Sequence, residues 1–458
     1  MVGDSLMKSN LSYASQYFFS ELLNISKYTK HSIKLLAEDL NNTIQYNGAF
    51  RTGISLQNAI SLHLKFLKDQ GLSVEEEEKY LKLVENPSIK EIFDKIKYER
   101  SEPDFFEFIQ DDNLVRLMVT TIDLKNEYER ELEYIFTNSI VNLTTIIEQL
   151  ISETIKFLII TNPKSVSIEK KQVTFEKIQE LGDIEAIQEY IINKKVSELM
   201  FEKNNKWFDF ISNNFKIDFS KIEDIYFFEV NELIQRRHII IHNASIIDEK
   251  YINNISDYKD EKIFIGQKIE NSPKYFFDKL KNITIFSIKF LDVILNKYEE
   301  KNVNFLYSIE KLSRFYYINE DFVTAEQILE IVFKEKYLSE VHSDDREDIT
   351  IQYWSAKRML NKIEKTDNDI KNYKPVKLKN KIYKSLIMEN YSELEELLTS
   401  LIKKEVSFFY ELEKNPLLRL VCEESENVQA FLIKIAKKTK KSFNHEGYIY
   451  KKYISNNE

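Results

Sequence analysis

Side chains that could do acid–base chemistry are concentrated in one apolar segment, residues 223–251. Its centre reads Arg236-Arg237-His238-Ile239-Ile240-Ile241-His242-Asn243, so guanidinium, imidazole and amide groups lie close together. A neutral imidazole titrates near pH 6.5 and can accept a proton from a hydroxyl at cellular pH. A guanidinium can hold phosphate oxygens while negative charge builds at phosphorus. Such groups can cleave a phosphodiester without a metal ion when the substrate supplies its own 2′-hydroxyl nucleophile.

A helix would place these polar side chains on one side. Successive residues turn by about 100°, so Asn231, Gln235, His238 and His242 fall on one narrow stripe. The rest of the circumference is mostly apolar, and we therefore expect a largely buried helix. Buried polar groups need partners, because each unpaired one costs about 1–3 kcal/mol.

Two interpretations of the stripe are open from side-chain types alone. The histidines could be core residues with satisfied hydrogen bonds, beside an arginine paired with Glu229 or Glu232. Alternatively, the stripe could be a phosphodiester-cleaving site.

The segment also resembles a known family. Arg237-His238-Ile239-Ile240-Ile241-His242 is similar to the Arg-polar-x-x-x-His signature of HEPN-domain ribonucleases, and Asn243 and IIDEKY follow it. The resemblance extends over about residues 127–300, including the turn at 262–269 and the long helix after it. It implies an up-and-down four-helix bundle, a homodimer with facing motif helices, and metal-independent RNA cleavage that leaves a 2′,3′-cyclic phosphate and a 5′-hydroxyl.

The resemblance also implies a role for each residue of the motif. His242 would be the general base or acid, and Arg237 the group that stabilises the phosphate. His238 occupies the polar position, where members usually carry Asn or Asp, and would orient substrate. Arg236 and Asn243 would support substrate binding. Family members typically act in phage defence or toxin-like growth arrest, so the expected partners are RNA, a second copy and a protein trigger or inhibitor, with no cofactor.

Composition predicts an all-α protein. The 458 residues include only 7 Gly and 6 Pro, which turns and strands need and long helices avoid. Aromatic residues are plentiful and charged residues make up 31%, which predicts a folded chain and not a disordered one. Apolar spacing predicts several helices over 5–100, a break at 101–104 and a boundary near 125. Further helices are predicted at 127–162 (closed by Pro163), 174–200, 203–215 and 224–243, then a turn at Gly266 and a last helix with Pro273 in its first turn.

We therefore expect a helical N-terminal domain of unknown role (1–125), a HEPN-like domain (126–302) and a helical C-terminal domain (303–458). In the last, residues 319–332 and 388–401 resemble each other at an offset close to two tetratricopeptide periods, which favours either a tetratricopeptide-like array or unrelated helices. Charged residues 342–348 and 368–375 are predicted to be loops or a linker.

Charge is distributed unevenly along the chain, and this bears on the expected function. The net charge is −10, made up of −4 in residues 1–125, −11 in 126–370 and +5 in 371–458. An acidic middle is unusual for a nucleic-acid enzyme and suggests autoinhibition or partner surfaces. Lysines at 371–384 and 434–441 could guide RNA or simply be solvated helix faces.

Other features narrow the class of protein. The single cysteine, Cys422, excludes an internal disulfide and predicts a buried thiol. No carboxylate cluster suggests a metal, and His31, His63, His342 and His445 stand apart from the motif. No stretch of about 18 apolar residues occurs, which predicts a soluble, cytoplasmic protein without a membrane partner. Two alternatives to the enzyme remain: a non-catalytic HEPN or helical-repeat scaffold that binds protein or nucleotide, and a tetratricopeptide-type adaptor.

Overall fold

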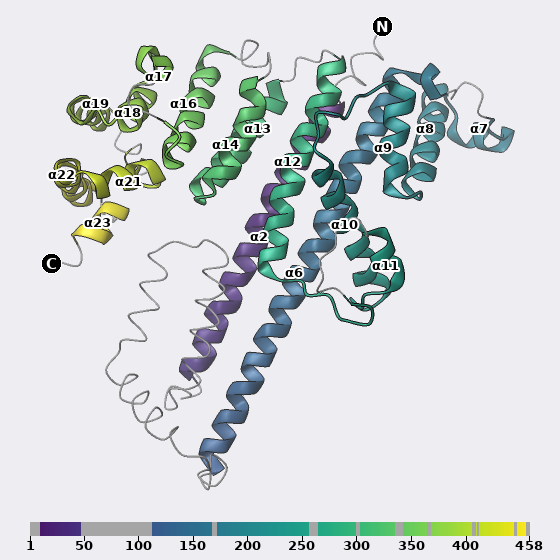
Figure 1. The fold of residues 1–458 in the computed structure, drawn as a ribbon, viewed down its shortest axis with the longest axis horizontal. Coiled ribbons are helices and arrows are strands. Elements are labelled where there is room, and N and C mark those ends of the chain that lie inside the picture. The colour runs from purple at the N-terminus through teal and green to yellow at the C-terminus, as the bar shows by residue number, and fades with distance from the viewer. Residues whose placement is uncertain are drawn as a thin grey trace. The chain divides into compact units, whose positions relative to one another are not determined.

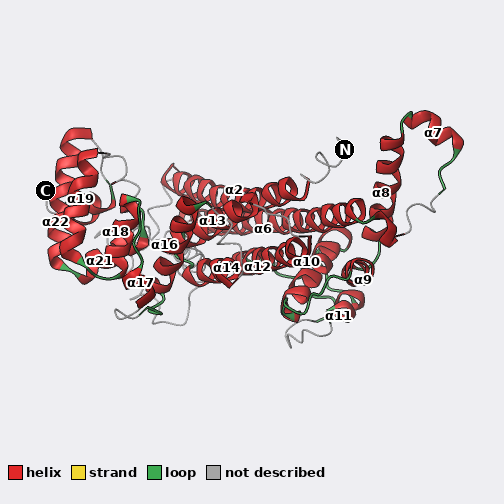
Figure 2. Ribbon diagram, turned by 90° about the horizontal axis from the view of Figure 1, so that it is seen from above, coloured by secondary structure: helices red, strands yellow, loops and turns green. Residues whose placement is uncertain are grey.

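The protein is all-α, as its composition predicts (Figure 1, Figure 2). The computed structural model describes residues 10–46, 112–166, 172–255, 264–298, 303–334, 342–363, 368–404, 409, 412–443 and 447–454. Within these ranges the only β-type pairing outside a helix is an isolated antiparallel bridge between Ile246 and Lys268. None of the helices in these ranges is both long and apolar enough to cross a membrane.

The chain divides into two compact units, residues 1–298 and 299–458. The predicted division into 1–125, 126–302 and 303–458 stays a prediction. The helices expected over 47–100 and the break at 101–104 lie outside the described residues, as does His63.

Long helices form the frame of the first unit. Its described helices are α2 (Asn10–Tyr46), α6 (Asp112–Thr161), the 3₁₀ turn η2 (Pro163–Val166), α7 (Phe175–Leu181), α8 (Ile184–Met200), α9 (Asn204–Phe215), α10 (Asp224–His242), α11 (Glu249–Asn254) and α12 (Pro273–Tyr298). Helix α6 begins well before residue 127 and runs unbroken across residue 125. The segment expected at 174–200 is two helices, because Gly182 ends α7 with a φ of 80° and the Asp183 side chain caps α8.

The core of this unit lies where α2, α6 and α12 run side by side (Figure 1). On the α6 face toward the core, Phe136, Ile140 and Ile147 are fully buried. Helix α12 supplies Phe276, whose ring centre lies 5.9 Å from that of Phe136. Each such large apolar side chain contributes about 1.5–3 kcal/mol on burial. Two polar side chains inside this core are paired: Thr29 of α2 and Ser139 of α6 share a buried hydrogen bond of 2.8 Å.

A cluster of phenylalanines holds the beginning of α10. Phe208 of α9 lies edge-to-face against Phe227 of α10, with ring centres 4.9 Å apart. Phe227 in turn meets Phe286 of α12 at 5.5 Å. Beside this cluster, Lys289 of α12 forms an ion pair with Glu223, the residue that precedes α10. The start of α10 is therefore fixed on two helices, and this sets the direction in which its far end points.

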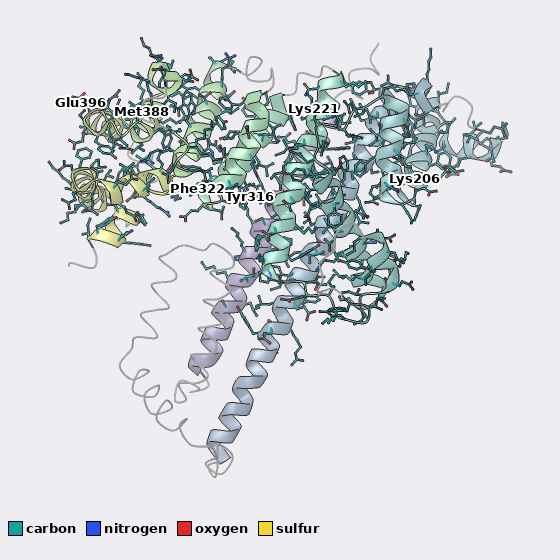
Figure 3. The ribbon with its side chains drawn as sticks, viewed as in Figure 1. Lys206, Lys221, Tyr316, Phe322, Met388 and Glu396 are labelled. Carbon is teal, nitrogen blue, oxygen red and sulfur yellow. The ribbon has the colours of Figure 1, made fainter. Side chains whose placement is uncertain are left out.

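The second unit consists of shorter helices. They are α13 (Val303–Ile318), α14 (Phe322–Lys334), α16 (Ser343–Met359), α17 (Asn368–Asn372), α18 (Leu378–Ile387), α19 (Tyr391–Lys404), α21 (Pro416–Glu424), α22 (Glu426–Phe443) and α23 (Tyr448–Tyr453). Tyr316 and Phe322 lie on either side of the α13–α14 turn, and Met388 marks the end of α18 (Figure 3). Cys422 is buried in the core of this unit, as predicted.

Two helical hairpins of this unit have a connecting turn of the same backbone conformation. Glu320 joins α13 to α14 with a φ of 65°, and Glu389 joins α18 to α19 with a φ of 56°. These turns lie within the two segments whose sequences resemble each other. The prediction of loops at 342–348 and 368–375 is wrong for most of these residues, because α16 and α17 begin there. Acidic side chains in a first turn favour a helix through its dipole, so charge alone was a poor sign of a loop.

Candidate catalytic site at the end of α10

One face of α10 carries a buried ionic network centred on Glu232. Its Oε1 accepts hydrogen bonds of 2.8 Å from Arg236 Nε and from the Tyr251 hydroxyl. Its Oε2 accepts a 2.6 Å bond from the Tyr275 hydroxyl and lies 2.7 Å from Lys279 Nζ. Burial would raise the pKa of Glu232, but the charges of Arg236 and Lys279 outweigh it and lower the pKa to about 2. The carboxylate is thus ionised and fully bonded.

Arg236 belongs to this network. It is 7% exposed, donates a 2.8 Å hydrogen bond to the Glu270 carbonyl, and its guanidinium carbon lies 3.5 Å from the ring centre of Tyr275. These contacts tie α10 to the start of α12. Arg236 is therefore the arginine that pairs with Glu232. A contact of Arg236 with substrate stays a prediction.

The polar stripe runs along another face of α10. Its first half binds α11: Asn231 Nδ2 donates to the Asn254 carbonyl at 2.7 Å, and Asn254 Nδ2 donates to Gln235 Oε1 at 2.9 Å. The second half consists of His238 and His242, whose ring centres lie 4.8 Å apart with the planes at 50°. The expected periodicity is thus present. The expectation of a largely buried helix is wrong at this end, where His238 is half-buried and His242 is exposed.

The imidazole of His238 has a perturbed pKa. Burial lowers it first, and the nearby charge of Lys250 and the second imidazole, His242, lower it further. Arg237 acts in the same direction, and only Asp248 opposes them. A lowered pKa leaves His238 neutral at cellular pH, which is the state that accepts a proton.

Arg237 differs from its neighbour Arg236. Its Nε is buried and has no hydrogen-bond partner among the described residues. The charge of Arg237 acts on Glu148 of α6, whose pKa is raised by burial and lowered to a smaller extent by Arg237. An unpaired buried N–H costs about 1–3 kcal/mol, so this N–H has the capacity to donate to a further acceptor.

Asn243 shapes the chain where α10 ends. Its Nδ2 donates to the Ile246 carbonyl at 2.6 Å, and Ala244 and Ser245 follow with φ values of 49° and 64°. A short ladder holds this turn, since the amide of Ile269 donates to the Ser245 carbonyl at 2.8 Å. The predicted turn at Gly266 faces it, with a φ of 84°. The described hydrogen bonds of Asn243 are thus structural, and its contact with substrate stays a prediction.

The two faces of α10, the one with the ionic network and the one with the histidines, have different surroundings. A cavity of about 410 Å³ opens beside the ionic network, lined by charged residues that include Glu229, Glu232 and Lys279. Neither the two histidines nor Arg237 belong to its lining. The imidazole pair instead lies toward an open surface, where Ile241 is 45% exposed. In the part of the chain that is described, no three His, Cys, Asp or Glu residues are arranged to hold a metal ion.

Comparison with known proteins finds no protein-family model, curated protein or solved structure that matches the chain. Within the ionic network, the pairing of an arginine with Glu232 was one of the interpretations open from the sequence, whereas the contacts of Tyr251, Tyr275 and Lys279 with Glu232 were not expected. The network's only local sign was the i,i+4 spacing of Glu232 and Arg236, a spacing that favours side-chain pairing on a helix.

Proposed function

We propose that the end of α10 is the catalytic centre of a metal-independent endoribonuclease of the HEPN type, built on a helical bundle that includes α6, α10 and α12. The observation that carries the proposal is the pairing of two imidazoles, 4.8 Å apart and with His242 exposed, with an arginine whose buried Nε lacks a partner among the described residues. The motif's spacing adds to it.

The reaction is a transesterification within RNA. The 2′-oxygen attacks phosphorus and forms a new P–O bond, while its proton passes to neutral His238. The bond from phosphorus to the 5′-oxygen breaks, and that oxygen takes a proton from His242. Arg237 donates N–H bonds to the non-bridging oxygens as charge builds on them. The products are a 2′,3′-cyclic phosphate and a 5′-hydroxyl, and DNA is not cut because it lacks the nucleophile.

We infer that two copies pair through this region. Ile241 at the end of α10 is 45% exposed, and Phe264 and Ile265 in the facing turn are 64% and 63% exposed. Exposed large apolar side chains at a helix end and in the turn that faces it support a protein-binding surface there. A second copy would bring two motif helices into one RNA cleft, in a cytoplasmic protein. A protein trigger or inhibitor that works in phage defence or growth arrest would act on the acidic middle of the chain.

The test is an RNA digest with the full chain in EDTA. We expect cleavage of RNA and not of DNA, with cyclic-phosphate ends. His242→Ala and Arg237→Ala should each lower the rate by about 10²-fold or more, as expected for lost acid–base or charge stabilisation. His31→Ala, an exposed histidine on α2, is the matched control and should leave the rate unchanged. Equal cleavage by all variants would show a contaminating nuclease and refute the assignment.

A non-catalytic scaffold is the second candidate, and the bonding of Arg236 favours it. If one arginine of the pair is wholly structural, the motif could serve to hold helices together. In that case the wild type cuts no RNA, and the His242 and Arg237 variants change only stability or partner binding. The same protein preparations therefore distinguish the two functions.

A further inference from the structure

A second cavity lies within residues 299–458, among α13, α16, α18 and the residues just before α21. We call it the α13–α21 pocket. Its volume is about 300 Å³, at the lower end of the range of about 300–1,000 Å³ that is typical of small-molecule sites. Its occupant must therefore be small. Neither the helices nor the residues of the α10 site contribute to it.

Cations from three parts of the fold converge on this pocket. Arg314 comes from α13, Lys379 from α18 and Lys414 from the segment before α21, whereas Asp348 is the single carboxylate in the lining. Asp348 is already bonded: it accepts a 2.6 Å hydrogen bond from Asn380 Nδ2 and lies 3.2 Å from Lys379 Nζ. Its negative charge is thus taken up by the wall itself, and the lining keeps a positive balance.

One neighbouring acid offsets part of that balance, and a second acid is bonded to the backbone. Glu310 pairs with Arg314 at 2.7 Å, one turn away on α13. Glu347 is held by the amides of Val376 and Lys377, at 2.8 and 2.9 Å. Lys414 is exposed, and no ion pair of it is found among the described residues. Its ammonium group is the cation most available to a ligand.

The remaining wall is uncharged and partly apolar. Ile318, Ile351, Tyr317 and Tyr383 line it. The Tyr317 hydroxyl donates to Asn415 Oδ1 at 3.0 Å, and burial raises the pKa of Tyr317, so this phenol stays neutral. A bare inorganic ion gains nothing from such a wall. An organic molecule buries its carbon skeleton against it while its anionic end faces the cations.

We propose that the α13–α21 pocket binds a small organic phosphate, with the phosphate between Arg314, Lys379 and Lys414 and the organic part against the tyrosines. A phosphate monoester carries about −1.5 to −2 charges at pH 7. It therefore matches this group of cations better than a ligand with a single carboxylate would. Dicarboxylates share this charge, so the test includes one. The proposal does not depend on RNA cleavage and stands if the α10 site is inactive.

Isothermal titration calorimetry on the full chain tests it. The probes are ribose 5-phosphate, adenosine 5′-monophosphate, inorganic phosphate and glutarate, each at the same ionic strength. We expect the two organic phosphates to bind more tightly than inorganic phosphate and glutarate. Lys414→Glu should weaken their binding at least tenfold, and Lys414→Arg should retain it. Lys381→Glu makes the same charge change at an exposed position of α18 outside the pocket and should alter affinity less than twofold.

Three results overturn the proposal. The organic phosphates fail to bind at millimolar concentration, glutarate binds as well as they do, or Lys414→Glu and Lys381→Glu weaken binding equally. The last result would mean general attraction to a basic surface. Because Lys414 is exposed and makes no ion pair within the described part of the chain, its substitution leaves the core intact, and lost binding is not explained by unfolding.

Discussion

The buried carboxyl group of Glu413 should make the second unit, residues 299–458, less stable as pH rises. Its side chain is 3% exposed and accepts a 3.2 Å hydrogen bond from the amide of Ile449. Burial raises its pKa from 4.5 to about 7, against the smaller opposing effects of that amide and of Arg419. We expect Glu413→Gln, which keeps the shape and the acceptor oxygen, to stabilise residues 299–458 at pH 8.

The size follows from the shift. A rise from 4.5 to about 7, at about 1.36 kcal/mol for each pKa unit, corresponds to about 3 kcal/mol. The folded chain holds this proton more tightly than the unfolded chain does. The free energy of unfolding therefore falls as pH rises from about 4.5 to about 7, and it stays low above that. Glutamine has no proton to lose, so the advantage of the variant should grow by about 3 kcal/mol between pH 4.5 and pH 8.

The chain offers a clean assay for this unit. It has two tryptophans: Trp207 lies in the first unit, 3% exposed, and Trp354 packs against the core of the second. In a Trp207→Phe background, Trp354 fluorescence reports urea unfolding of residues 299–458 alone. The free energy of unfolding is measured with and without the Glu413→Gln substitution at pH 4.5, 6, 7 and 8. Parallel curves for the two proteins would refute the reasoning, because they would show that this carboxyl does not titrate differently in the folded state.

Three further predictions concern the described contacts. Glu232→Ala should destabilise the first unit by about 3–5 kcal/mol, measured by urea unfolding, because it leaves the buried Arg236 uncompensated; a loss below about 1 kcal/mol would contradict this. Gly447→Ala should cost the second unit about 1–3 kcal/mol in the same assay, since its methyl group would overlap the Glu413 carboxylate; unchanged stability would show that the segment can shift freely. If the proposed nuclease is active, the acidic limb of its kcat/KM profile should lie below pH 6.5, because the pKa of His238 is lowered; a limb above pH 6.5 would exclude His238 as the base.

Local signals in the sequence predicted elements well. Apolar spacing placed α10 within a residue of its observed ends, and Pro273 and Gly266 marked a helix start and a turn where the structure has them. The polar stripe was also placed correctly, because side-chain direction along a helix depends only on its period. The four-helix HEPN arrangement, in contrast, stays a prediction.

Roles that depend on distant residues were not readable. Arg236 and Arg237 are adjacent and chemically identical, yet only Arg236 meets Glu270 and Tyr275, more than 30 positions away. The packing of the start of α12 on α10 decides which of the two arginines is used in contacts within the protein. The loops expected in the second unit are wrong for a different, local reason: charged residues at 343–348 and 368–372 lie in helices, and acidic side chains are favourable at a helix start.

The unbroken course of α6 has a mechanical consequence. A helix of 50 residues is about 75 Å long, and it behaves as a stiff rod over this distance. Near its middle, Thr137 receives a hydrogen bond from Asn271, and Glu148 lies in the field of Arg237. A displacement of the first turns of α6 would therefore be transmitted along this rod to Asn271, which accepts a hydrogen bond from Arg236, and to Glu148.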